Sequence, residues 1–232
     1  MKSFYTLFPG KLIALTLLLF SALGTVQTQT TLAPGDIVFT QLNMEGTNED
    51  AFAFVLLTSV EPGTVVRITD KEYVSGMGFT EESEGIITIT FNQAYPCGTE
   101  VLITDSDPAN DQYVFAASET GVQVDQNTAN SFQLSTAGET MVMFQGDDLV
   151  NPCATCFITA LANTGVEFGG TATGSGDLPP GLTVGTSAMA MTSGPGGDEW
   201  DNIKYNCSTT QADPADLRPA ILNPVNWTTD ND

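Results

Sequence analysis

Histidine is absent from this 232-residue sequence, and only six residues are lysine or arginine. Without histidine, the chain cannot form a Ser-His-Asp triad, a Cys-His pair, a histidine-ligated zinc site or a histidine general base. The shortage of basic side chains also argues against a nucleic-acid partner, because lysine and arginine must displace the counterions of the phosphates. The 28 acidic residues give a net charge of −22, which favours cations, basic partners or simple solubility.

Long apolar runs are also missing, except near the start of the chain. Lys2 and Lys11 provide a positively charged region, residues 12–23 form a short apolar run, and cleavage is expected after Gly24. A membrane anchor is the alternative, but the run falls short of the roughly 20 residues that a spanning helix needs. We therefore interpret residues 1–24 as a signal peptide and expect a secreted protein without a membrane span in its mature form.

The remaining sequence has the periodicity of β-strands. Apolar and polar side chains alternate in residues 85–91, as in a half-buried antiparallel strand, and short turn sequences such as residues 61–63 separate the apolar segments. Strands are expected at residues 36–42, 51–59, 64–70, 85–91, 100–105, 131–135, 139–145, 157–162 and 187–191. This pattern predicts an all-β fold: an antiparallel β-sandwich or jelly roll, formed by residues 25–232 as one domain, with long loops in the C-terminal third.

Four cysteines in an exported chain predict disulfide bonds. They are Cys97, Cys153, Cys156 and Cys207, and the sequence leaves three pairings open. We favour a local Cys153–Cys156 bond and a long-range Cys97–Cys207 bond. A redox-active CxxC pair would need a strand-to-helix setting, whereas Cys156 precedes a strand-like segment. A four-cysteine zinc site usually shows two CxxC pairs, and here there is one.

Clustered carboxylates and amides are the most suggestive polar features. They are Glu45, Asn48, Glu49 and Asp50 between the first two strands, Asp70 at the end of the third, and Asp105, Asp107, Asn110 and Asp111 following the fifth. Calcium takes six to eight oxygen ligands, which loops at one end of a sandwich can supply together. Residues 105–116 are not an EF-hand, because Ala109, Asn110 and Ala116 occupy positions that need other residues. The candidate calcium ligands are Glu49, Asp50, Asp70, Asp105 and Asp107.

These acidic residues have two other interpretations. They can simply form Asx turns and solvated loops, or two of them can act as the acid and nucleophile of a glycosidase, although no spacing singles out a pair. Trp200 and Trp227, with Tyr205 nearby in the sequence, are candidates for a sugar-binding face, but a core role is more frequent for tryptophan. No GxSxG, SxxK or GxGxxG motif occurs in residues 25–232.

Segments along nearly the whole mature chain resemble, in order, a recurrent secreted bacterial domain that has no established activity. The resembling segments are residues 35–39 (GDIVF), 49–57, 62–70, 85–91, 98–104, 144–161, 178–188 (LPPGLTVGTSA) and 221–227, which ends in Asn226-Trp227. The resemblance implies an extracellular β-sandwich, loosely similar to lamin-tail domains, of the kind found in larger surface or secreted proteins. It brings no catalytic residues with it.

Taken together, these features predict a secreted, non-enzymatic module for interaction with a cell-surface or matrix component, with calcium as the expected cofactor in its acidic loops. Two alternatives stay open. One is a secreted polysaccharide hydrolase that uses two carboxylates, which would then lie about 5 to 9 Å apart in a cleft. The other is an acidic protein that binds mineral or matrix through a flat face dense in carboxylates.

Overall fold

The computed structural model describes residues 28–44, 50–80, 84–106, 114–126, 132–192, 199–207 and 213–230. The signal peptide expected over residues 1–24 lies outside these ranges. Strands dominate the described residues, and α2 (Pro214–Ile221) is the one α-helix among them. None of the helices in this part of the chain is long and apolar enough to cross a membrane.

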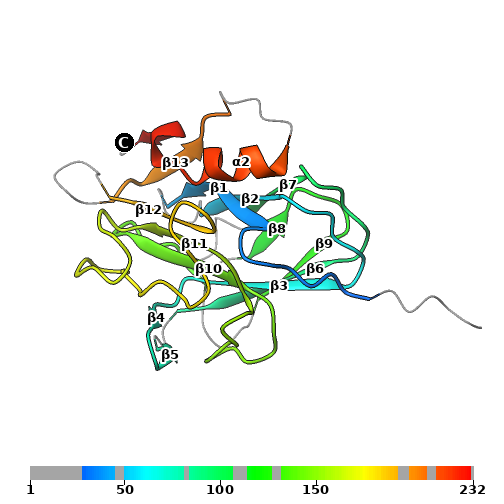
Figure 1. The fold of residues 1–232 in the computed structure, drawn as a ribbon, viewed down its shortest axis with the longest axis horizontal. Coiled ribbons are helices and arrows are strands. Elements are labelled where there is room, and N and C mark those ends of the chain that lie inside the picture. Colours follow the sequence, from blue (N-terminus) through cyan, green and yellow to red (C-terminus); the bar gives the residue numbers. More distant parts are fainter. Residues whose placement is uncertain are drawn as a thin grey trace, which may run out of the picture.

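Two six-stranded sheets stack on each other (Figure 1), which confirms the all-β sandwich. The order in the first sheet is β14-β13-β1-β2-β7-β8, and all neighbours are antiparallel. Its strands are β1 (Ile37–Asn43), β2 (Ala51–Leu56), β7 (Glu100–Asp105), β8 (Phe115–Ala117), β13 (Asn202–Tyr205) and β14 (Trp227–Asp230).

The order in the second sheet is β12-β11-β10-β3-β6-β9, with one parallel pair, β11 and β12. Its strands are β3 (Thr64–Thr69), β6 (Ile86–Phe91), β9 (Val122–Gln126), β10 (Glu139–Phe144), β11 (Phe157–Asn163) and β12 (Ala188–Met191). A separate hairpin consists of β4 (Tyr73–Val74) and β5 (Gly78–Phe79).

The main hydrophobic core fills the space between the two sheets. On β6, the side chains of Ile87, Ile89 and Phe91 are fully buried while Thr88 and Thr90 are half-exposed, as the alternation in the sequence predicts. Burying one such large apolar side chain stabilises the fold by about 1.5 to 3 kcal/mol. The inward faces of the strands are therefore what holds the sheets together.

A second hydrophobic cluster lies on the outer face of the second sheet. There Phe144 of β10 and Phe157 of β11 pack against Tyr73 and Phe79 of the β4–β5 hairpin, with ring centroids 5.4 to 6.3 Å apart. Leu182 from the long C-terminal loops joins this cluster. The predicted loops of the C-terminal third thus cover the sheet, and this is why β10 and β11 are buried on both faces.

Helix α2 packs near β1 and holds the residue that begins the last strand. Asp213 caps its N-terminus by accepting a hydrogen bond from the Ala215 N–H at 2.8 Å, and proline occupies the first turn. The indole N–H of Trp227 donates to the Ile221 carbonyl at 2.6 Å, and Trp227 is 7% exposed. Trp227 therefore has the core role, and it anchors the start of β14.

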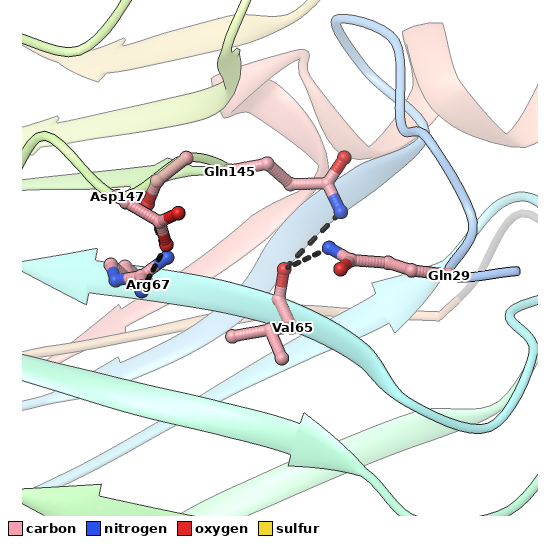
Figure 2. Close-up of polar contacts among 6 residues, drawn as sticks. Gln29, Val65, Arg67, Gln145 and Asp147 are labelled. Carbon is pink, nitrogen blue, oxygen red and sulfur yellow. Dashed lines mark hydrogen bonds and ion pairs between the residues drawn. The ribbon is translucent and has the colours of Figure 1, made fainter.

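The segment before β1 crosses the second sheet and is held by Gln145. The Gln145 side chain accepts a hydrogen bond from the Leu32 N–H at 2.8 Å and donates to the carbonyls of Thr30 and Val65. The Gln29 side chain also donates to the Val65 carbonyl, at 3.4 Å (Figure 2). These bonds tie the incoming chain to β3 and to the end of β10.

Candidate functional site

Three buried carboxylates hold one short backbone segment between the sheets. The N–H groups of residues 133, 134 and 135 donate in succession to the carboxylates of Asp70 (2.9 Å), Asp50 (2.8 Å) and Glu139 (3.1 Å). Asp50 lies just before β2 in the first sheet, whereas Asp70 follows β3 and Glu139 begins β10 in the second. We call Asp50, Asp70 and Glu139 the carboxylate clamp, because together they join both sheets to this segment.

The clamp explains why one expected strand is missing. The expected strand at residues 131–135 was wrong: residue 131 lies outside the described residues, and residues 132–135 form no strand. The N–H groups of residues 133–135 bond to carboxylates instead of a neighbouring strand, while Phe132 and Leu134 enter the core at 1% and 3% exposure. Alternating apolar residues produce the same burial pattern in a β-strand and in an extended segment that is held by side chains.

Burial shifts the titration of all three clamp residues. Desolvation raises the pKa of Asp50 to about 6 against the lowering effect of its hydrogen bond from Leu134, and the charge of Asp105 adds to the rise. Desolvation likewise raises the pKa of Asp70 to about 7, although backbone hydrogen bonds oppose it. The pKa of Glu139 lies well above its ordinary value because of burial and the nearby charges of Asp70 and Glu84.

The structure brings together only part of the predicted calcium-ligand set. Glu49 and Asp107 lie outside the described residues. Asp70 also accepts from the Gly85 N–H at 2.8 Å, and Asp105 accepts from the Val114 N–H at 3.1 Å. Among the residues that the structure describes, no group of three acidic or cysteine side chains is placed to hold a metal ion. The described carboxylates are thus engaged with backbone N–H groups, and calcium binding stays a prediction.

The cysteines form one of the two expected bonds. Cys153 and Cys156 are joined by a disulfide, as predicted. Cys97 and Cys207 are both exposed free thiols, so the second expected bond is absent. Cys97 lies just before β7 and Cys207 just after β13, with β1 and β2 between those strands. Three strand spacings amount to about 14 Å, more than twice the usual Cα separation in a disulfide.

The two lateral edges of the sandwich differ. On one side the edge strands β8 and β9 contact each other, because the turn at residues 118–121 carries the chain from the first sheet to the second. On the other side the sheets end in β14 and β12, and neither has a further strand within the described ranges. We call the surface along β14 and β12 the open side.

Two hollows lie along the open side. One, of about 240 Å³, is lined by Met191, Trp200, Pro224, Val225 and Trp227 together with Thr192 and Thr229, and we call it the apolar hollow after its five apolar residues. The other, of about 260 Å³, lies over β1, β13 and β14. Its polar lining includes Gln41, Asn43, Asn202, Lys204, Thr228 and Asp230. Val225 is 79% exposed, so an apolar side chain stands out into solvent here.

Three acidic residues each lie one position along the chain from a residue of the apolar hollow, and we call them the acidic rim. Glu199 and Asp201 flank Trp200, and Asp230 follows Thr229. Burial raises the pKa of Asp201, and the charges of Glu199 and Asp230 raise it further. Asp201 is thus close enough to both Glu199 and Asp230 for their like charges to interact, which gives the rim a negative potential.

Comparisons of the chain with models of protein families, with curated proteins and with solved structures give no match. Membership of the secreted bacterial domain family therefore stays a prediction. The open side had no counterpart among the candidate sites expected from the sequence, apart from Trp200 and Trp227. Its signal was weak, because β13 and β14 are four residues each and partly polar.

Proposed function

We propose that this protein is a secreted, non-enzymatic module that binds another macromolecule at a cell surface or in the extracellular matrix. The observation that carries this proposal is the open side, where two hollows lie beside an edge strand that ends the sheet within the described residues. Both hydrophobic clusters of the described residues are covered, one by the two sheets and the other by loops and a hairpin. Val225 on the open side is the most exposed large apolar side chain among the described residues, so a partner can make apolar contacts there.

The export signal and the Cys153–Cys156 disulfide support a location outside the cell, because disulfides persist in oxidising compartments. The carboxylates that come together in the fold do not favour the hydrolase alternative. Asp70 and Glu139 are 0% and 1% exposed and bond to the backbone of the segment beside them, so a polysaccharide could not reach them. We therefore place the function at the surface of the sandwich.

A site-specific photocrosslinker tests this proposal on the surface of the producing cells. One variant carries benzoylphenylalanine at Val225, on the open side, where the native side chain is 79% exposed. The matched control carries it at Met77, which is 64% exposed in the turn of the β4–β5 hairpin. Both positions accept a large side chain without disturbing the core.

We expect a discrete crosslinked product from the Val225 variant and none from the Met77 variant. Products from both positions in equal amount would show contact without a specific surface and would contradict the proposal. No product from either position would contradict it as well.

Calcium is proposed as a separate property, because the interaction surface does not include the predicted ligands. Thermal unfolding with millimolar calcium and with EDTA tests it. An ion present at about 100 times its Kd stabilises the fold by about 2.7 kcal/mol, so an unchanged midpoint would remove the calcium proposal.

A further inference from the structure

The backbone of β14 offers hydrogen-bonding groups away from its own sheet. Residues 227 to 230 pair with residues 205 to 202 of β13, and the Asn206 N–H donates to the Asn226 carbonyl at 2.9 Å. In an antiparallel ladder, hydrogen-bonded and non-hydrogen-bonded pairs alternate. The pair Ile203 and Thr229 is therefore non-hydrogen-bonded, and the N–H and C=O of Thr229 point away from β13.

The space beside this edge suits alternating side chains. Strand β14 places Trp227 inward and Thr228 outward, and Thr229 lines the apolar hollow with Trp200 and Val225. An added strand would direct every second side chain into the apolar hollow. Its other side chains would extend over the outer face.

Charge decides which strand fits. Glu199, Asp201 and Asp230 give the rim a negative potential, and the entire chain has a net charge of −22. A second copy of the chain would bring the same acidic rim against itself, which like-charge repulsion disfavours. A segment rich in lysine or arginine would instead be attracted, with Lys204 as the basic residue that it would have to avoid.

We propose that the open edge of β14 binds an extended, cationic polypeptide segment, which adds to the first sheet as a further antiparallel or parallel strand. This inference rests on the proposed function and names the chemical class of its partner. Main-chain hydrogen bonds to Thr229 provide the pairing, the apolar hollow receives alternate side chains, and the acidic rim selects for positive charge. The edge is short, so the complex is weak and depends on salt.

The probe is an eight-residue peptide of alternating lysine and valine, and its binding to the full mature chain is measured by fluorescence anisotropy. A peptide of alternating glutamate and valine controls for charge. A lysine–valine peptide with N-methyl groups on alternate residues controls for strand pairing, because it keeps the charge but loses half of its N–H donors.

Protein variants test strand pairing and charge separately, by changes in the protein and not in the peptide. Thr229→Pro removes the outward N–H without removing a bond to β13, and Thr229→Val is the matched control that keeps the N–H. The combined variant E199Q/D201N/D230N removes the negative rim. Circular dichroism confirms that each variant is folded.

We expect the lysine–valine peptide to bind and the glutamate–valine and N-methylated peptides not to bind. Thr229→Pro should weaken binding at least tenfold, whereas Thr229→Val stays within twofold. Loss of each of these three charges should cost about two- to fivefold in affinity, and the combined effect should shrink at high salt. If Thr229→Pro does not fold, the charge variant and the N-methylated peptide still decide the outcome.

Equal affinity of Thr229→Pro and Thr229→Val for the lysine–valine peptide would overturn strand addition. Equal binding of the lysine–valine and glutamate–valine peptides would overturn the proposal as well. Dimerisation of the chain through this edge would also overturn it in favour of a second copy. A Val225 crosslink together with unaffected binding by Thr229→Pro would keep the interaction role and reject only the strand. Absence of the Val225 crosslink would reject the interaction role itself.

Discussion

Replacing Asp70 by asparagine should change how the stability of the protein depends on pH. Asp70 is 0% exposed, and burial raises its pKa in the folded protein from 3.8 to about 7. A difference of this size corresponds to about 4 kcal/mol between the two protonation states. Because the folded-state pKa is the higher one, this contribution to stability is fully present below about pH 4 and is lost as the pH rises towards 7.

The pH dependence of the wild-type free energy of unfolding does not by itself isolate the contribution of Asp70. Asp50 and Glu139 also have raised pKa values, and repulsion among 28 acidic residues grows over the same pH range. The asparagine variant removes the titration of residue 70 while it keeps a similar size. It also loses one of the two hydrogen bonds from Gly85 and Gln133, at a cost of about 1 to 3 kcal/mol that does not depend on pH.

The measurement is the free energy of unfolding in urea for both proteins, at several pH values between about 4 and 8. We expect the deficit of Asp70→Asn relative to wild type to shrink by up to about 4 kcal/mol as the pH rises. Asp125→Asn, at an exposed position on β9, is the control and should show a nearly constant difference. A deficit of Asp70→Asn that stays constant or grows with pH would refute the reasoning.

Two further predictions concern Gln145 and the free thiols. Gln145→Leu should lower the free energy of unfolding by about 2 to 3 kcal/mol, because it leaves the Leu32 N–H without its acceptor. Gln29→Leu, which removes a single 3.4 Å contact at an exposed position, should cost less than about 0.5 kcal/mol, and equal losses would contradict this account. In the unreduced, folded protein, both Cys97 and Cys207 should react with a maleimide, because both are exposed and unbonded. Mass spectrometry would detect two adducts, and a chain that takes up none would indicate that they are joined.

Long strands with alternating or continuously apolar sequence were predictable. Residues 85–91 and 157–162 correspond to β6 and β11 within one residue at each end, because their burial pattern follows directly from side-chain hydrophobicity. Strands β13 and β14 were missed, since four partly polar residues form a strand only through pairing, here of β13 with β1 and of β14 with β13. Helix α2 was missed because eight residues are too few to show helical periodicity.

The clustering of acidic residues in the sequence singled out two members of the carboxylate clamp, but as candidate metal ligands and not as acceptors of backbone hydrogen bonds. Asp50 and Asp70 were expected in loops at strand ends, where they are found, but as calcium ligands. Their burial and their backbone donors depend on residues 132–135, more than 60 positions away in the chain. Glu139 was overlooked because an acidic residue at the start of an apolar strand is usually solvated, whereas here it is 1% exposed.

The most direct test of the open edge is the hydrogen-exchange rate of the Thr229 backbone N–H, measured by NMR in the free chain and with the lysine–valine peptide. The ladder register directs this N–H away from β13, so we expect fast exchange in the free protein. Peptide binding should slow it at least tenfold, while the Thr228 N–H, which faces β13, changes little. Protection of Thr229 already in the free chain, or an unchanged rate with peptide bound, would contradict the account.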